Sequence, residues 1–181
     1  MQAGFIFAKC RGGKGVFSMR ADELAMLFDL DKHMENGRFL EKNEPPSGQT
    51  RSSSGCMYYY VAPGELTKFH RLDCDEYWCY NAGAVLELWL LSPDGSLRIE
   101  KCGVGSGAEP MVRVPKGTVF ASRHAADCDN GTFLSLITVP RFQYSGMTLY
   151  EGNALAELIR LHPALAEFWS TASEGEKEAP L

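Results

Sequence analysis

The chain has 181 residues, of which 45% are hydrophobic and 23% are charged, values typical of a globular protein large enough to fold as one domain around a buried core. Its net charge of −5 at pH 7 argues against nucleic acid as a partner, because nucleic-acid-binding domains carry a basic surface. The chain contains no run of about 18 apolar residues, so neither a transmembrane helix nor a membrane partner is expected.

The N-terminal segment is basic: residues 1–20 carry four basic side chains and no acidic one. Such a composition occurs in organelle transit peptides, although the glycines in this segment weaken the helix that a transit peptide needs. We interpret residues 1–20 as an accessory extension, residues 21–169 as the folded domain and residues 170–181 as a polar, solvated tail. Organelle targeting by the basic segment stays open beside this interpretation.

The six cysteines indicate the compartment. None forms a Cys-x-x-Cys pair, which argues against a structural zinc site. No secretory signal is visible, so we expect reduced thiols in a cytoplasmic protein, with several of the cysteines serving as small core residues.

The first predicted element is a helix over residues 21–30, where three apolar residues recur at helical spacing. The helix is expected to end near His33, whose ordinary role there would be to cap the helix end. The Asn-Gly pair at residues 36–37 predicts a turn, and the polar residues 41–55 predict a loop.

From residue 56 onwards the sequence is typical of short β-strands separated by turns. Strands are predicted over residues 56–61, 68–72, 76–80, 85–91, 96–101, 111–114, 119–124 and 132–139. A helix over residues 154–161, capped by Asn153, follows them. Short strands without alternating helices predict an all-β antiparallel sandwich or barrel, and the jelly-roll barrel fits the pattern best.

The second and third of these strands are expected to pair as a hairpin, because only three residues separate them. Side chains alternate between the two faces of a strand, so His70 and Leu72 share one face of the first strand, and Glu76, Trp78 and Tyr80 share one face of the next. Such a hairpin would place an imidazole, a carboxylate, an indole and a phenol around the same pocket. That composition is typical of a small-molecule pocket.

The spacing of Gly64, His70, Glu76 and Gly83 resembles the first motif of the cupin superfamily, in which two histidines and a glutamate lie between two glycines. Leu72 stands where that motif has its second histidine.

A second stretch narrows the resemblance to one branch. His33-Met34-Glu35-Asn36-Gly37-Arg38-Phe39-Leu40-Glu41 is similar to the His-Pro-Glu-Gly-Gly-Tyr-Phe-Arg-Glu signature of the cupin-five branch, whose function is unknown. Further similarities follow in chain order at Arg51, Met57-Tyr58-Tyr59, Phe69-His70-Arg71-Leu72, Asp75-Glu76-Tyr77-Trp78, Val114-Pro115-Lys116-Gly117 and Val139-Pro140-Arg141-Phe142.

The resemblance implies a double-stranded β-helix, the cupin jelly-roll barrel, with a short N-terminal helix and a C-terminal helix. It also implies a homodimer. The branch is similar in architecture to deoxysugar epimerases, metal-free cupins that use a histidine base and a tyrosine acid. Because no activity is established for the branch, the resemblance predicts a shape rather than a reaction.

A metal centre is the site that most cupins would suggest, and it needs three or four protein ligands around an open position. His70 and Glu76 qualify, whereas Leu72 cannot coordinate and Phe120 stands where the second cupin motif places a histidine. His124 is the remaining candidate for a third ligand. We therefore expect no cofactor, and keep a metal-dependent enzyme with His70, Glu76 and His124 as a minor alternative.

The favoured hypothesis is metal-free acid–base chemistry, of the isomerase or epimerase kind, on a sugar or related carbonyl compound. His70 is the candidate base, Glu76 the carboxylate that orients it, and Tyr58 or Tyr80 the proton donor across the pocket.

Four residues are predicted to contact the small-molecule ligand: Glu35, Arg51, Trp78 and Phe120. Each has a purely structural alternative, as a turn carboxylate, a surface ion pair or a core aromatic side chain. The alternative function is a non-catalytic module that binds or senses a small ligand, in which His70 and Glu76 only satisfy each other inside the barrel.

Overall fold

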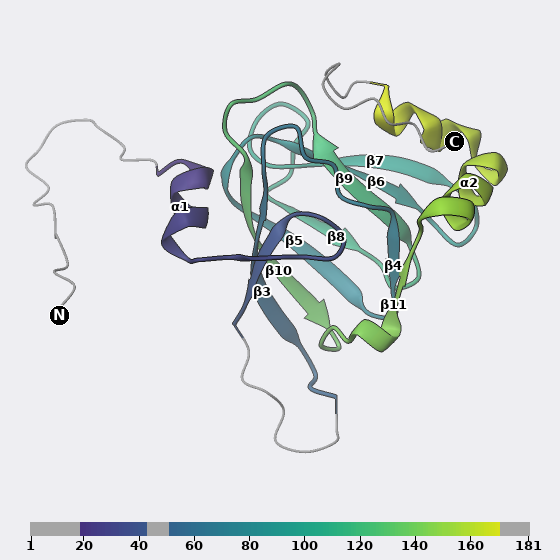
Figure 1. Ribbon diagram of the computed structural model, residues 1–181, viewed down its shortest axis with the longest axis horizontal. Helices are drawn as coiled ribbons and strands as arrows, with labels where there is room; N and C mark the ends of the chain where they lie inside the picture. Colours follow the sequence, from purple (N-terminus) through teal and green to yellow (C-terminus); the bar gives the residue numbers. More distant parts are fainter. Residues whose placement is uncertain (1–18, 43–50, 171–181) are drawn as a thin grey trace, which may run out of the picture.

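Two antiparallel β-sheets pack face to face in the computed structural model, which describes residues 19–42 and 51–170 (Figure 1). The six-stranded sheet has the order β1 (Asp31–Lys32), β2 (Arg38–Glu41), β3 (Gly55–Val61), β10 (Thr132–Val139), β5 (Asp75–Gly83) and β8 (Met111–Val114). The five-stranded sheet has the order β11 (Met147–Leu149), β4 (His70–Leu72), β9 (Val119–His124), β6 (Leu86–Leu91) and β7 (Leu97–Cys102). This arrangement confirms the predicted jelly roll.

The helices cover the outer faces of the two sheets. Helix α1 (Ala21–Leu27) packs on the six-stranded sheet, over Tyr60 and Phe133. Helix α2 (Gly152–Leu161) and the 3₁₀ helix η2 (Pro163–Trp169) pack on the five-stranded sheet, and a short 3₁₀ turn, η1 (Tyr144–Gly146), precedes β11. Among the described residues no helix is both long and apolar enough to cross a lipid bilayer.

The main core lies between the sheets, where inward-facing side chains of both meet. Its fully buried members include Tyr59, Trp78, Leu88, Phe120, Leu134 and Leu136. Cys74 and Cys102 are buried in the same core, as expected of small apolar side chains. This interior is therefore filled by side chains over most of its length.

The predicted hairpin of His70 and Glu76 is wrong, because β4 and β5 lie in different sheets. Strand β4 pairs with β9 and β11, whereas β5 pairs with β10 and β8. Leu72, Cys74 and Glu76 are all buried, so the inward alternation continues through the connection. The chain thus crosses from one sheet to the other instead of turning back, and the two strands face each other across the core.

Several element boundaries also differ from the predictions. Helix α1 ends at Leu27, so His33 does not cap it, and Asn153 lies inside α2, whose N-cap is Glu151. The short strands β1, β2 and β11, of two to four residues, were not predicted. Most of the predicted N-terminal extension and C-terminal tail lies outside the described residues.

Candidate functional site

A buried pair of Glu35 and His70 lies at the centre of the candidate site. The Nε2 atom of His70 is 3.0 Å from the Oε2 atom of Glu35, and the two residues are 1% and 4% exposed, respectively. On its other side the imidazole is fixed by a 2.8 Å contact between Nδ1 and the Lys68 carbonyl. The Phe120 ring covers His70, with its centroid 4.0 Å from that of the imidazole. Glu35, rather than Glu76, is therefore the carboxylate that contacts His70.

Glu35 reaches this position because a tight turn follows β1. Asn36 and Gly37 both have left-handed backbone conformations, with φ of 73° and 72°, as the Asn-Gly pair predicted. The Tyr59 hydroxyl donates to the Asn36 carbonyl at 2.8 Å, and the Lys68 backbone N–H donates to the Glu35 carbonyl at 2.8 Å. These bonds tie the turn to both sheets and hold the carboxyl group over the core.

His33 is the third member of the cluster, and it is also buried, at 4% exposure. Its Nδ1 atom lies 3.6 Å from the Oε2 atom of Glu35 and accepts a long hydrogen bond, 3.5 Å, from the Glu35 backbone N–H. The sequence interpretation missed this role because it assigned His33 to a helix end. The sequence did contain a sign of this role, because His33 matches the first residue of the cupin-five signature.

Glu76 completes the cluster from the facing strand. Its Oε2 atom accepts a 2.8 Å hydrogen bond from the indole N–H of Trp78, which is fully buried. Burial, together with the nearby carboxyl group of Glu35, raises the pKa of Glu76 to about 7. Glu76 therefore holds its proton at pH values where an exposed glutamate would be ionised.

Burial also shifts the other three groups towards their uncharged forms. It raises the pKa of Glu35 and lowers the pKa values of His33 and His70, because each charged form would lose its hydration inside the protein. The facing charges of Glu35 and Glu76 oppose the shifts of His33 and His70, respectively, but burial is the larger effect. Burial thus favours the uncharged forms of all four groups.

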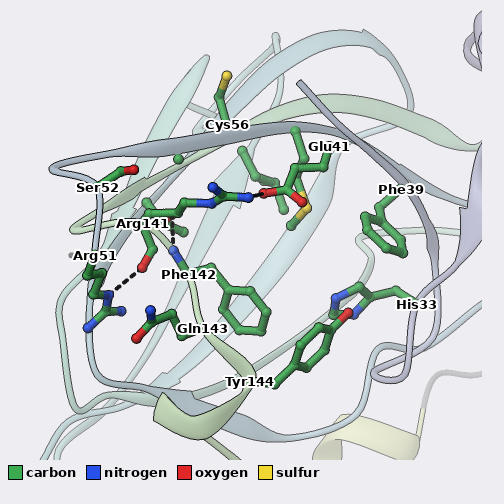
Figure 2. A pocket seen from close by; sticks show the side chains of 14 residues that line it. His33, Phe39, Glu41, Arg51, Ser52, Cys56, Arg141, Phe142, Gln143 and Tyr144 are labelled. Carbon is green, nitrogen blue, oxygen red and sulfur yellow. Dashed lines mark hydrogen bonds and ion pairs between the residues drawn. The ribbon is translucent and has the colours of Figure 1, made fainter. Parts of the chain in front are cut away.

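A cavity of about 300 Å³ opens beside this cluster, at the end of the barrel where β3 begins and β10 ends (Figure 2). It is lined by His33, Phe39, Glu41, Arg51, Ser52, Gly55, Cys56, Met57, Leu136, Thr138, Arg141, Phe142, Gln143 and Tyr144. Apart from its charged rim, the lining is mostly apolar, as in many small-molecule sites. His33 belongs both to this lining and to the buried cluster.

Aromatic rings surround His33 where it meets the cavity. The ring of Phe39 stands edge-on to the imidazole, with centroids 4.8 Å apart. Tyr144 lies nearly parallel to it at a centroid distance of 6.2 Å, and Phe142 packs against Tyr144 at 4.9 Å. Figure 2 shows these rings gathered at one end of the cavity. His33 is thus presented within an aromatic wall.

The charged groups of the cavity are held in ion pairs at its rim. Arg51 binds Asp73 through two hydrogen bonds of 2.9 Å and 2.7 Å, and Arg141 pairs with Glu41. The Asp73 carboxylate holds the pKa of Arg51 above its usual value. Arg51 therefore lines the predicted ligand site, but its charge is balanced by a neighbouring carboxylate.

The structure does not bring the predicted tyrosines to His70. Tyr58 points to the outer face of β3, where its ring packs against Phe28 and Phe133 under α1. The adjacent Tyr59 points inwards instead, as strand alternation requires. Tyr80 packs on the main core, but its hydroxyl donates to the Gly83 carbonyl at 2.8 Å. The predicted role of Tyr58 as proton donor conflicts with this outward orientation.

Of the four predicted ligand contacts, Arg51 lines the cavity, and the other three are buried side chains outside its lining. Trp78 is 0% exposed, Phe120 is 1% exposed and Glu35 is 4% exposed. Trp78 and Phe120 are core residues that support the cluster, with ring centroids 6.2 Å apart. His70 is likewise absent from the cavity lining, so a bound molecule would meet His33 first.

The donor set does not fit the metal centre that cupin barrels commonly hold. Both nitrogens of His70 are engaged, by the Lys68 carbonyl and by Glu35, and Glu76 accepts from Trp78. His70 lies opposite Phe120 in the β4–β9 pair, and His124 is four residues further along β9, opposite Leu86. That separation is about 13 Å along a strand. Over residues 19–42 and 51–170, no three His, Cys, Asp or Glu side chains are grouped to hold a metal ion.

Comparison with solved structures finds the same fold in uncharacterised proteins. An X-ray structure of a protein from Shewanella oneidensis is 26% identical, with a TM-score of 0.74, and the match covers 88% of this chain and 100% of that one. A hypothetical protein from Leishmania major is 25% identical, with a TM-score of 0.67, over 81% of this chain and 94% of that one. Oxalate decarboxylase from Bacillus subtilis shares the fold alone, at 16% identity and a TM-score of 0.53, over 92% of this chain and 41% of that enzyme.

Comparison with protein families gives a direct assignment. A search among curated proteins found no match. The family described as Cupin superfamily (DUF985) matches residues 22–150, which include the His33 turn, the cavity wall and strands β1 to β11. The chain therefore belongs to the DUF985 family of the cupin superfamily.

Proposed function

We propose that the protein binds a small, uncharged molecule in the cavity at the mouth of the barrel. The observation that carries this proposal is the position of His33, which joins an aromatic-walled cavity of about 300 Å³ to the buried Glu35–His70 pair. A mostly apolar cavity with a few placed polar groups is the usual form of a small-molecule site.

The charges around the cavity favour an uncharged ligand. The Arg51 and Arg141 side chains are paired with Asp73 and Glu41, so neither arginine is left to balance the charge of an anion. A charged ligand would have to break one of these ion pairs or enter the cavity without a partner, and both cost free energy. A molecule with one apolar face and a polar oxygen matches the lining better.

A second candidate function is a metal-free isomerase or epimerase-like reaction on a sugar or related carbonyl compound. The observation that favours it is the placement of the His33 imidazole, which lines the cavity with the buried Glu35–His70 pair behind it and could act on a carbonyl group bound there. In this version His33, rather than His70, is the residue that touches the substrate, because His70 lies behind Glu35 and Phe120.

The binding proposal is tested by immobilising the protein, passing a metabolite extract over it and identifying the retained small molecules by mass spectrometry. The variant Gln143→Trp places an indole at an exposed position of the cavity lining, so it should abolish retention. The matched control is Ser145→Trp, an exposed neighbour outside the lining, which should retain the same compound as the wild type.

Equal retention by Gln143→Trp and the wild type would contradict the proposal. The enzymatic version is tested by incubating the retained compound with the protein in heavy water. Incorporation of deuterium at a carbon next to a carbonyl group would support proton transfer, whereas tight binding without exchange would favour a binding or sensing module.

A further inference from the structure

The contacts of His70 fix the position of one of its protons. Its Nδ1 atom lies 2.8 Å from the Lys68 carbonyl oxygen, which can only accept a hydrogen bond. Nδ1 must therefore carry a hydrogen. In the neutral ring the other nitrogen, Nε2, is then an acceptor, and it faces the Oε2 atom of Glu35 at 3.0 Å. This short contact requires one proton between the two atoms.

That proton can lie on either partner, and the surroundings favour Glu35. An ion pair of His70 and Glu35 would bury two charges at 1% and 4% exposure, with the Phe120 ring packed on the imidazole. An ionised Glu35 would also face the carboxyl group of Glu76 inside the same cluster. A carboxylic acid that donates to a neutral imidazole avoids both penalties.

The protonation of Glu35 then determines which nitrogen of His33 carries hydrogen. The Nδ1 atom of His33 accepts from the Glu35 backbone N–H at 3.5 Å, and it lies 3.6 Å from Oε2. A carboxylate at Oε2 would attract a hydrogen on Nδ1. An uncharged carboxyl group is a much weaker acceptor, so Nδ1 keeps the hydrogen bond from the Glu35 backbone N–H and, in the neutral ring, Nε2 carries the hydrogen.

We propose that Glu35 is uncharged and donates its proton to His70, and that His33 in consequence presents an N–H donor to the cavity. The molecule bound there then offers an acceptor oxygen, such as a carbonyl, to His33. This inference rests on the proposed function of the same cavity and adds the chemistry of the contacting group. In the enzymatic version His33 polarises the carbonyl as a donor, and Glu35 and His70 are positioning residues.

The test is a long-range ¹H–¹⁵N correlation spectrum of the protein labelled with ¹⁵N-histidine, which reports the protonation of each ring nitrogen. The chain contains four histidines, and His124→Gln and His162→Gln assign the two that lie outside the cluster. At pH 7 we expect neutral rings at both cluster positions, with the hydrogen on Nδ1 of His70 and on Nε2 of His33.

His124 serves as an internal standard for this spectrum. Its Nε2 atom lies 3.1 Å from the Thr132 hydroxyl, which itself donates to the Ala84 carbonyl at 2.7 Å. The hydroxyl must therefore accept, so His124 should show its hydrogen on Nε2. A doubly protonated His70, or a hydrogen on Nδ1 of His33, would overturn the proposal.

A variant tests the same point independently. In Glu35→Gln an amide N–H can replace the carboxylic O–H as donor to His70, so both nitrogen patterns should persist and the affinity for the retained compound should change less than threefold. Conversion of His70 from doubly protonated to neutral on this substitution would contradict an uncharged Glu35. If the variant does not fold, the wild-type spectrum alone decides. Because the spectrum needs no ligand, failure of the proton assignment is distinguished from failure of binding.

Discussion

The Oε2 atom of Glu35 lies 3.0 Å from the Nε2 atom of His70, although Glu35 follows a strand of one sheet and His70 belongs to the other. The pair thus links the turn after β1 to the five-stranded sheet. It also forms the wall between the cavity and the core, because His33 contacts Glu35 from the cavity side and Phe120 covers His70 from the core side. The stability and the chemistry of the site therefore depend on the same few side chains.

The raised pKa of Glu76 predicts a pH-dependent stability that Glu76→Gln should remove. The folded protein holds a proton on Glu76 up to a pKa of about 7, whereas the unfolded chain releases it near 4.5. The stability contributed by this group is thus fully present below pH 4.5 and is lost as the pH rises through 7. The difference in unfolding free energy, wild type minus variant, should fall by about 2–3 kcal/mol over this range.

Urea denaturation at closely spaced pH values checks this prediction. Glutamine keeps an acceptor oxygen for Trp78, so the variant should fold, and Glu109→Gln controls for the loss of an exposed carboxylate. The lowered pKa values of His33 and His70 act in the opposite direction, since they reduce stability as the pH falls below 6.5. The shift of His33 is common to both proteins, whereas His70 loses the opposing charge of Glu76 in the variant. A pH-independent difference between wild type and Glu76→Gln would contradict the assignment.

The turn that carries Glu35 should be intolerant of a side chain at Gly37. Its φ of 72° costs a non-glycine residue about 1–2 kcal/mol. A Cβ atom there would also lie 2.5 Å from the Tyr59 hydroxyl, and overpacking of this kind typically adds about 1–3 kcal/mol. Gly37→Ala should therefore destabilise the protein and displace the His33 ring.

Gly64 supplies a matched control for this substitution. Its φ of 73° is nearly the same, but a Cβ atom at this position would have no neighbour within 4 Å. Gly64→Ala should show the backbone strain alone, so thermal unfolding should find it more stable than Gly37→Ala. Equal melting temperatures would show that the contact with Tyr59 does not restrict the turn.

The fold was predictable from the sequence because most strands are long enough to show their alternation. Strands β8, β9 and β10 have the predicted boundaries, and β3 differs by one residue. The connection between β4 and β5 was not predictable in the same way. A three-residue link between two short strands is compatible both with a hairpin and with a crossing between sheets, and only the packing of Cys74 and Glu76 in the core decides between them.

The candidate site was predicted in part, and two of the errors share one cause. His70, Glu76, Trp78 and Phe120 do meet inside the barrel, because inward alternation holds in both sheets. The partner of His70 was misassigned because Glu35 arrives from a turn, where no periodicity indicates the direction of a side chain. The position of His33 was not predicted for the same reason, because it depends on the turn formed by the left-handed residues Asn36 and Gly37.

We expect the purified protein to contain much less than one metal ion per chain. Leu72 and Phe120 replace the two histidines of the cupin motifs, and His124 lies too far along β9 to complete a site with His70. Elemental analysis of protein purified without chelators checks this expectation. One equivalent of a single transition metal, lost together with the ligand-binding activity on dialysis against a chelator, would contradict it.

We expect the protein to form a homodimer through the outer face of the six-stranded sheet. Met111, Ile137 and Val139 are 57%, 37% and 45% exposed on the strands of this sheet. Burial of such side chains between two chains would be favourable. Ile137→Asp should convert a dimer to a monomer in light scattering, whereas Ile99→Asp, at a 46% exposed position of the other sheet, should not. A monomeric wild type would contradict this expectation.

The most direct test of the proposed site is the dissociation constant of the compound that the wild type retains, measured by titration calorimetry for wild type, His33→Phe and His162→Phe. Loss of one hydrogen bond to the ligand should weaken binding by about tenfold or more in His33→Phe. His162→Phe, outside the cavity lining, should bind as the wild type does. An unchanged dissociation constant for His33→Phe would contradict the conclusion that His33 is the polar contact of the site.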